Sequence, residues 1–235
     1  MRAFTDVLLP QTCLGCKTEG FFLCTICREG INEYKYFACP VCKQRRVEGR
    51  LERECRRVCG LTRFVGAPLP YSHELVKKTI HAFKYQYAKE IAHLLSQILC
   101  RFLDKNNFPD QIASYKTRML LAPVPLSDFR ERERGFNQAT EIARPLSAHF
   151  DIPLAEKLLR KDAYTRPQAD IHDKETRAAN IAGAFSVRHP EAVRGKIILL
   201  LDDVYTTGAT MRECALVLRE SGATEVWGIT IARGE

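Results

Sequence analysis

The pattern of apolar and polar positions changes twice along this chain of 235 residues. Residues 1–64 contain no long apolar run, whereas apolar residues recur at helical spacing between His73 and Leu103. Short continuous apolar runs then alternate with further helical patterns to the end of the chain. This alternation is typical of an open, mostly parallel α/β sheet. We therefore predict an α/β domain over residues 65–235 and a small domain over residues 1–64.

The apolar runs predict the strands of that sheet. "MLLAPVPL" (119–126), "GAFSV" (183–187), "KIILLL" (196–201) and "EVWGITIA" (225–232) are predicted strands, and the third reads as a strand buried on both faces. Helices are predicted over residues 137–150, with a kink or break at Pro145, and over residues 209–221. The charged segment 127–138, "SDFRERERGFNQ", is predicted to form a turn.

Cysteine spacing gives the clearest chemistry in the N-terminal part. Eight of the ten cysteines form close pairs before residue 60: Cys13/Cys16, Cys24/Cys27, Cys39/Cys42 and Cys55/Cys59. Such pairs present two thiolates to one tetrahedral ion, so we predict one or two structural Zn²⁺ ions. Sequential pairing, with the first four and the last four as separate sets, is favoured because shorter loops lose less entropy, and interleaved pairing stays open. Beyond these pairs we find no internal repeat, and Cys100 and Cys214 are interpreted as core residues.

Targeting signals and net charge bear on where the protein is located and on what kind of partner it binds. No secretory signal is recognised and no apolar stretch approaches membrane-spanning length, so we expect a cytoplasmic protein with reduced thiols and no membrane span. The formal net charge is +8, and residues 43–63 hold eight Lys or Arg against three Glu. This excess has two readings, a nucleic-acid-binding face or a solvated face that balances zinc-thiolate charge.

The segment 198–210, "ILLLDDVYTTGAT", places two carboxylates directly after an apolar run and before a small, hydroxyl-rich turn. Ligands of open α/β sheets bind beyond the carboxyl ends of the strands, and a helix N-terminus offers N–H groups to phosphate. Gly208 allows a close backbone approach. Ionised carboxylates accept hydrogen bonds from a vicinal diol. The segment therefore predicts a site for a 5-phosphorylated ribose.

This segment also resembles the thirteen-residue signature of type I phosphoribosyltransferases. The resemblance implies that Asp202 and Asp203 contact the ribose hydroxyls of phosphoribosyl pyrophosphate (PRPP) as the catalytic acids. It assigns the 5-phosphate to the turn residues Thr206, Thr207, Gly208, Ala209 and Thr210. An acidic strand end followed by an ordinary glycine turn is the alternative reading, and a nucleoside triphosphate P-loop is disfavoured because no G-x-x-x-x-G-K-[ST] occurs.

A wider set of motifs resembles the ComF family. These motifs are the paired cysteines, "PVPL", "RERGFNQA", "RPQ…R..N..GAF" and "DDVYTTGAT". The resemblance implies a cytoplasmic PRPP-binding protein of natural transformation, acting with a ComFA-like helicase or ATPase and the DNA-uptake machinery, peripheral to that complex. It implies Mg²⁺ bound with PRPP and leaves open whether the protein catalyses phosphoribosyl transfer to an acceptor.

The resemblance also suggests which residues meet the pyrophosphate. By position or by chemistry these are Val124, Pro125, Arg130, Arg134, Asn137 and Gln138, since guanidinium groups form forked hydrogen bonds with diphosphates. Lys84 and Arg177 are within possible reach of the same ligand, and the favoured interpretation of each is a surface cation. An acceptor hood is assigned either to the segment after residue 66 or to residues 163–185. The alternative function is a zinc-ribbon adaptor without catalysis that binds a helicase-like partner or single-stranded DNA, with Tyr34, Tyr36 and Phe37 available for base stacking.

Overall fold

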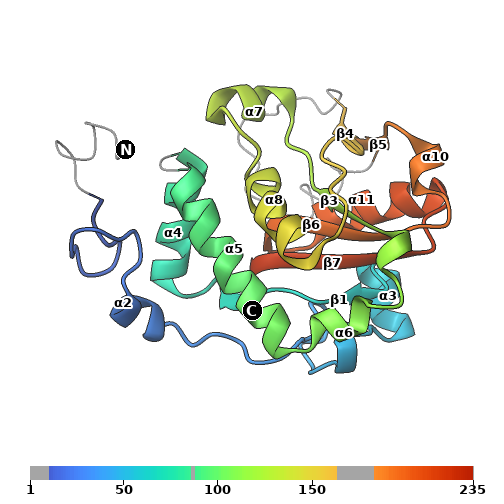
Figure 1. Ribbon diagram of the computed structural model, residues 1–235. Helices are drawn as coiled ribbons and strands as arrows, with labels where there is room; N and C mark the ends of the chain where they lie inside the picture. The colour runs from blue at the N-terminus through green and yellow to red at the C-terminus, as the bar shows by residue number, and fades with distance from the viewer. Residues whose placement is uncertain (1–10, 86–87, 163–182, 235) are drawn as a thin grey trace.

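The computed structural model describes residues 11–85, 88–162 and 183–234, and its elements are shown in Figure 1. The helices are α2 (Thr25–Glu29), α3 (Arg53–Cys59), α4 (Glu74–Tyr85), α5 (Ala88–Lys105), α6 (Phe108–Ile112), α7 (Asp128–Arg134), α8 (Gln138–Phe150), α10 (Pro190–Val193) and α11 (Ala209–Glu220), with 3-10 turns η1 (Val47–Gly49) and η2 (Lys116–Arg118). The strands are β1 (Arg63–Phe64), β2 (Leu69–Pro70), β3 (Met119–Pro123), β4 (Leu159–Lys161), β5 (Phe185–Val187), β6 (Ile197–Tyr205) and β7 (Glu225–Arg233).

A parallel sheet forms the centre of the molecule. Its strand order is β1-β7-β6-β3, and β2 also pairs with β7. Leu199 of β6 lies opposite Leu121 of β3 on one side and Trp227 of β7 on the other. β4 and β5 form a separate antiparallel pair. The predicted α/β class with a mostly parallel sheet is confirmed.

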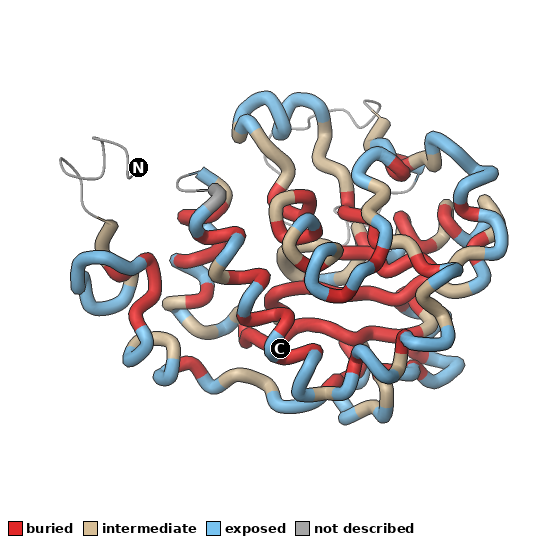
Figure 2. Tube along the Cα trace, in the orientation of Figure 1, coloured by how far each residue is buried: buried red, intermediate tan, exposed pale blue. Residues whose placement is uncertain are grey.

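Side chains of β6 alternate between the two faces of the sheet because successive residues of a strand point in opposite directions. Ile197, Leu199 and Leu201 pack with α4, α5 and α8, whereas Ile198 and Leu200 pack with α3 and α11. All five side chains are buried, and the red strands of Figure 2 show that this holds along much of the sheet. The continuous apolar run therefore records burial on both faces, as predicted.

The cysteine-rich segment contributes to both layers of this core. Phe22 and Phe37 belong to the core on the α4 side, and Cys39, Cys55 and Cys59 belong to the core on the α11 side. Its last residues, 63–64, form β1 and pair with β7. The boundary at residue 64 stays a prediction.

Three local predictions are corrected. Segment 127–138 is not a turn: Asp128–Arg134 form helix α7, which begins at the Ser127 cap and ends at Gly135 with φ 77°. α8 continues through Pro145 without a break. β6 continues to Tyr205, so the turn before α11 begins later than expected.

No helix among the described residues has the length and apolar character that crossing a bilayer requires.

Candidate functional site

Two cysteine clusters lie in the N-terminal segment. In the first, the sulfur atoms of Cys13, Cys16, Cys24 and Cys27 all lie within 4.8 Å of one another, and in the second those of Cys39, Cys42 and Cys55 do. Both donor sets fit Zn²⁺, which prefers thiolate ligands in a tetrahedral arrangement. The sequential grouping is therefore the one that the fold brings together.

Cys59 does not join the second cluster as expected. Helix α3 carries Cys55 and Cys59 one turn apart, but the buried Cys59 lies outside the group of sulfurs within ligand distance of one another. Burial raises the pKa of Cys59 to about 11. The second cluster thus offers three thiols, with Arg46 donating a hydrogen bond to Cys42 Sγ at 3.1 Å.

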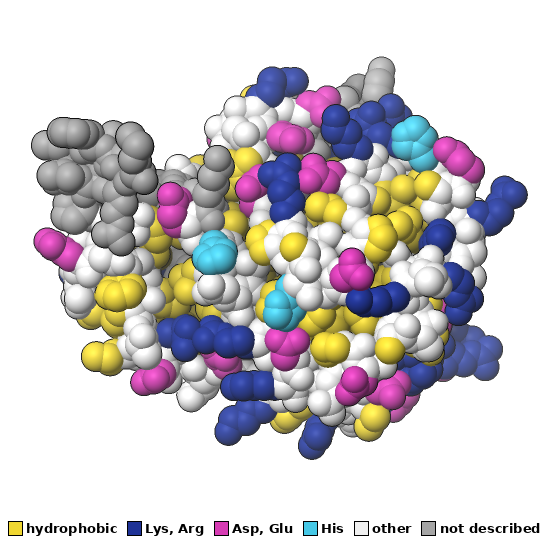
Figure 3. Space-filling view, viewed as in Figure 1, with side chains coloured by type: hydrophobic (Ala, Val, Ile, Leu, Met, Phe, Trp, Pro, Cys, Tyr) yellow, Lys and Arg dark blue, Asp and Glu magenta, His cyan; other side chains and the backbone are white. Residues whose placement is uncertain are grey.

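The three glutamates of residues 43–63 all pair with arginines of the same segment, and five of its eight cations remain in excess. Arg46 pairs with Glu52, Arg50 with Glu48 and Arg57 with Glu54. On the face seen in Figure 3, Lys and Arg side chains are interspersed with Asp and Glu. These contacts do not decide between a charge-balancing face and a nucleic-acid-binding face, so both readings stay predictions.

The turn between β6 and α11 is built around Gly208. Its φ is 76°, and it caps α11 at the N-terminus. A Cβ at this position would lie 2.1 Å from the Tyr205 hydroxyl oxygen, so only glycine fits. Asp202 and the residues from Val204 to Met211 line a cavity of about 40 Å³ here. That volume holds about three water molecules, a scale that suits a phosphate group and not a nucleobase.

The two adjacent acids lie toward opposite faces of the sheet. Asp203 forms an ion pair with Lys84 of α4, with 3.0 Å between Oδ2 and Nζ. Asp202 interacts electrostatically with Cys214 of α11 and with Lys161 of β4, and the charge of Lys84 acts on it as well. Only Asp202 lines the small cavity beside the turn. A sugar above the strand end could still contact both acids, but it would do so from their two sides.

Asp202 is the most perturbed carboxyl group of the site. Burial, followed by the neighbouring charge of Asp203, raises the pKa of Asp202 to about 8. The backbone N–H of Asp203 donates to Asp202 Oδ1 at 2.8 Å and partly opposes this rise. At neutral pH a carboxyl group with this pKa is mostly protonated. Hydrogen bonds from ligand hydroxyl groups would favour its ionised form and so promote loss of the proton.

Four of the six residues predicted to meet pyrophosphate, Val124, Arg134, Asn137 and Gln138, lie around the loop after β3 and the start of α8. Val124 donates its N–H to the Leu201 carbonyl at 2.8 Å, and its own carbonyl accepts from Asn137 Nδ2 at 3.0 Å. Asn137 also caps α8. Arg134 Nη1 donates to Gln138 Oε1 at 2.9 Å. The loop after β3 is thereby fixed to the first turn of α8, beside the end of β6.

Two donors in this group have no partner among the described residues. They are Arg134 Nε and Gln138 Nε2, and both atoms are buried. Arg134 also lies over the ring of Tyr85, 5.5 Å from its centre. Unsatisfied buried donors are costly in a folded protein, and a ligand with acceptor oxygens at this point would satisfy both atoms.

The other residues predicted for the site are more exposed or make fewer contacts. Arg130 is exposed on α7, and its charge acts on Lys161. Pro125 is partly buried in the loop, and Thr206 and Thr207 are exposed in the turn. Arg177 and residues 163–182 of the proposed hood lie outside the described residues.

Two cations of the site differ from the sequence expectations. The favoured interpretation of Lys84 as a surface cation is not what the structure shows, because Lys84 pairs with Asp203 and follows Val76 and Ile80 at helical spacing on the stripe of α4 that faces the core. That spacing could have indicated its position. Lys161 carried no local signal, because its approach to Asp202 depends on how β4 folds over the sheet.

Larger cavities lie elsewhere in the described structure. One of about 510 Å³ lies between α5 and α8, and one of about 500 Å³ lies between α4 and the first cysteine pair. Neither contains adjacent acids at a strand end, so the site is assigned by its chemistry and not by volume.

Comparisons with known proteins agree with this geometry. Residues 123–234 match the family described as phosphoribosyl transferase domain. Competence protein F of Haemophilus influenzae is 32% identical over 156 residues, covering 65% of this chain and 66% of that protein. Competence protein ComFC of Bacillus subtilis is 29% identical over 218 residues, covering 90% and 84%, and the DNA utilization protein YhgH of Escherichia coli K12 is 27% identical over 230 residues, covering 87% and 95%.

Among solved structures, glutamine PRPP amidotransferase from B. subtilis is 19% identical, with a TM-score of 0.37 over 61% of this chain and 27% of that chain. That similarity is too low to support a functional comparison. The domain match, the relatives across most of the chain, the parallel sheet and the paired N-terminal cysteines lead to one conclusion: the chain belongs to the ComF family.

Proposed function

We propose that this protein binds PRPP with Mg²⁺ at the end of β6 and supports DNA uptake in the cytoplasm. The observation that carries the proposal is the junction of Asp202 and Asp203 with the turn at Gly208, inside a phosphoribosyltransferase domain. Asp202 and Asp203 accept hydrogen bonds from the ribose hydroxyls. The turn from Thr206 to Thr210 receives the 5-phosphate on its N–H and hydroxyl groups.

Cations around the strand end support a place for the pyrophosphate. Lys84 lies beside Asp203, Lys161 acts on Asp202, and Arg134 is held by Gln138. The buried donors Arg134 Nε and Gln138 Nε2 would gain acceptors from a diphosphate. Mg²⁺ is proposed because a diphosphate binds a hard, oxygen-seeking cation to balance its charge.

We propose phosphoribosyl transfer as the reaction of this site. The bond between the anomeric carbon and the pyrophosphate oxygen breaks, and a bond forms from that carbon to the acceptor nucleophile, which loses its proton. Positive charge develops on the ribose ring, and pyrophosphate leaves as an anion. Residues such as Arg134 and Lys84 would stabilise the leaving group, while the turn at Gly208 holds the 5-phosphate.

The relatives named for competence and DNA utilization support a role in handling incoming DNA. A ComFA-like helicase or ATPase and the DNA-uptake machinery are the proposed partners, with single-stranded DNA as a further ligand. The two cysteine clusters are proposed to bind Zn²⁺ and to stabilise the N-terminal segment on the transferase domain.

Calorimetry with PRPP and Mg²⁺ tests the binding proposal. Wild type should release or take up heat with saturation at one PRPP per chain, and Asp203→Asn should weaken binding by about tenfold or more. Asp151→Asn is the control, because Asp151 is exposed on α8's C-terminal side and pairs only with Lys116 among the described contacts. An absence of saturable heat from wild type would contradict the proposal.

Release of pyrophosphate tests catalysis. Zinc-loaded protein is incubated with PRPP and Mg²⁺ and a panel of bases, amines and oligonucleotide ends. Release that depends on one acceptor class supports transfer. If PRPP binds but no acceptor promotes release, the adaptor function becomes the better description, with PRPP as its regulator.

A further inference from the structure

The two cysteine clusters contain the same local fold. Each begins with the sequence C-x-x-C-K, as Cys13–Lys17 and as Cys39–Lys43. In both, the first cysteine N–H donates to the residue five positions later, and the lysine N–H donates back to the first cysteine at 2.9 Å. Lys17 has φ 67° and Lys43 has φ 63°. We call these segments, residues 12–19 and 38–45, the first and second knuckles.

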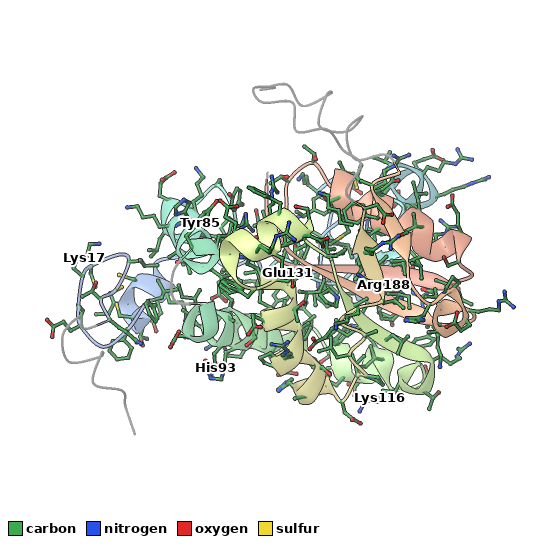
Figure 4. All side chains as sticks on the ribbon, turned by 90° about the horizontal axis from the view of Figure 1, so that it is seen from above. Lys17, Tyr85, His93, Lys116, Glu131 and Arg188 are labelled. Atoms are coloured by element: carbon green, nitrogen blue, oxygen red, sulfur yellow. The ribbon has the colours of Figure 1, made fainter. Side chains whose placement is uncertain are left out.

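The knuckles differ in what they contact. Gly15 of the first knuckle lies against Leu75 of α4, and Lys17 lines an open cavity beside that helix. Figure 4 shows Lys17 at one edge of the molecule, on the side away from α11. Nothing in the described contacts joins this knuckle to the turn at Gly208.

The second knuckle reaches that turn through the end of the chain. Lys43 Nζ donates to the carbonyl of Gly234 at 2.9 Å, and the Gly234 N–H donates to the Tyr205 carbonyl at 2.8 Å. A Cβ on Gly234 would lie 3.9 Å from Thr206 Cα, so the residue after β7 packs directly on the start of the turn. The lysine of the second knuckle thus connects to Tyr205, the residue that precedes the turn at Gly208 (below, the phosphate turn).

The side chain of Tyr205 also links the second knuckle with the turn at Gly208. Its ring packs edge-on to Phe64 with 5.4 Å between centroids, and it shares a buried cluster with Cys39 and Cys59. Its hydroxyl lies under Gly208, where a Cβ would collide with it. Displacement of Tyr205 would therefore change the surface on which Gly208 packs. The second knuckle contributes Cys39 to the buried cluster that holds Tyr205.

We propose that Lys43 is a positioning residue for the phosphate turn, through Gly234 and Tyr205, and that Lys17 has no such role. The second knuckle is then a part of the ribose-phosphate site, whereas the first serves only to stabilise the N-terminal segment. The inference rests on the proposed function for its ligand. The contacts themselves do not depend on any ligand.

Hydrogen exchange and calorimetry on the full, zinc-loaded chain test this role in Lys43→Met, Lys43→Arg and Lys17→Met. Zinc content is measured for each variant with a chromophoric chelator, and only variants that retain wild-type zinc are compared. Without ligand, Lys43→Met should speed amide exchange at residues 205–210, while Lys17→Met should leave it at the wild-type rate. Lys43→Arg keeps a cationic donor and should restore most of the protection.

Binding of ribose 5-phosphate provides the second readout. Lys43→Met should weaken it by about fivefold, the scale of one lost hydrogen bond, and Lys17→Met should not change it. Unchanged exchange at 205–210 in Lys43→Met, or an equal change in Lys17→Met, would overturn the inference. If wild type does not bind ribose 5-phosphate but Lys43→Met alone speeds exchange, the positioning role stands and the proposed function fails.

Discussion

The two ends of the central sheet carry charged groups in different surroundings. At the amino end, Arg63 is 2% exposed and lies over the ring of Trp227 at 4.1 Å, with Glu48 and Glu225 as acidic partners. At the carboxyl end, two carboxyl groups occupy the adjacent positions Asp202 and Asp203 of β6. The first arrangement is packed in the core against aromatic rings, although Arg63 Nε and Nη2 have no hydrogen-bond partner among the described residues. The second leaves a carboxyl group with a raised pKa beside a small cavity.

This difference separates stability from binding. A guanidinium packed against aromatic rings in the core contributes to the folded state through that packing. Adjacent carboxyl groups with a perturbed pKa cost stability, and such groups cluster at functional sites. We therefore expect substitutions at the amino end to change unfolding and those at the carboxyl end to change binding.

The largest expected effect is at the amino end. Arg63→Ala removes a buried side chain from between Trp227 and its neighbours, and should lower the free energy of unfolding by about 4 kcal/mol. Arg63→Met fills most of the volume without a buried charge and should recover most of that loss. Denaturant unfolding measures both. A loss of PRPP binding in a folded Arg63→Met protein would contradict the separation.

The next largest effect is expected from a substitution in the turn at the carboxyl end of β6. Gly208→Ala forces a left-handed backbone on alanine and a collision with Tyr205, so ribose 5-phosphate affinity should fall by about 100-fold. Gly195→Ala is the matched control, because Gly195 has φ 73° but open space around its Cβ position. Calorimetry should show wild-type affinity in that control. Equal binding losses in the two variants would refute the close fit at Gly208.

The pH dependence of the free energy of unfolding tests the protonation state of Asp202. Its pKa is about 8 in the folded protein, against an ordinary value of 3.8 for an aspartate, so the folded protein holds more protons than the unfolded chain between these values. Stability should therefore fall as pH rises from about 4 to 8, and Asp202→Asn should remove this fall. Denaturant unfolding at several pH values measures the slope, and an unchanged slope in Asp202→Asn would assign it to another group.

Binding should show the opposite trend. Ribose hydroxyls donate to the ionised carboxylate, so affinity for ribose 5-phosphate should rise by about tenfold between pH 7 and pH 9. The phosphate is already largely dianionic across that range. Titrations in buffers of different ionisation enthalpy should show proton release on binding. Proton uptake would contradict an ionised Asp202 in the complex.

The smallest effect concerns the ion pair at the carboxyl end. Lys84→Met breaks the contact with Asp203 and should lower the free energy of unfolding by about 1 kcal/mol or less. Lys77→Met, which breaks an exposed pair with Glu74 on the same helix, is the control. A loss of several kcal/mol in Lys84→Met alone would make this end of the sheet a stabilising element after all.

Sequence patterns predicted the parts of the structure that depend on local order. The apolar run of β6 gave a strand buried on both faces, and the cysteine spacing gave the first cluster. Helix α7 was missed because Asp128–Arg134 carry no apolar stripe, although Ser127 and Gly135 supply caps at its two ends.

The site itself was predicted only in part, for a related physical reason. The turn at Gly208 is local, so its residues could be identified, and their roles stay proposals. The opposite directions of Asp202 and Asp203, the approach of Lys161 and the exclusion of Cys59 from the second cluster depend on contacts between distant segments. No spacing within one segment encodes such contacts.

The central claim is that Asp202 and Asp203 hold the ribose diol, and comparison of two sugars tests it most directly. Calorimetry measures ribose 5-phosphate and 2-deoxyribose 5-phosphate against wild type and against the double variant Asp202→Asn, Asp203→Asn. Wild type should prefer ribose 5-phosphate by about tenfold, the scale of a hydrogen bond to a charged group, and the double variant should lose that preference. Equal affinity of wild type for the two sugars would contradict the account.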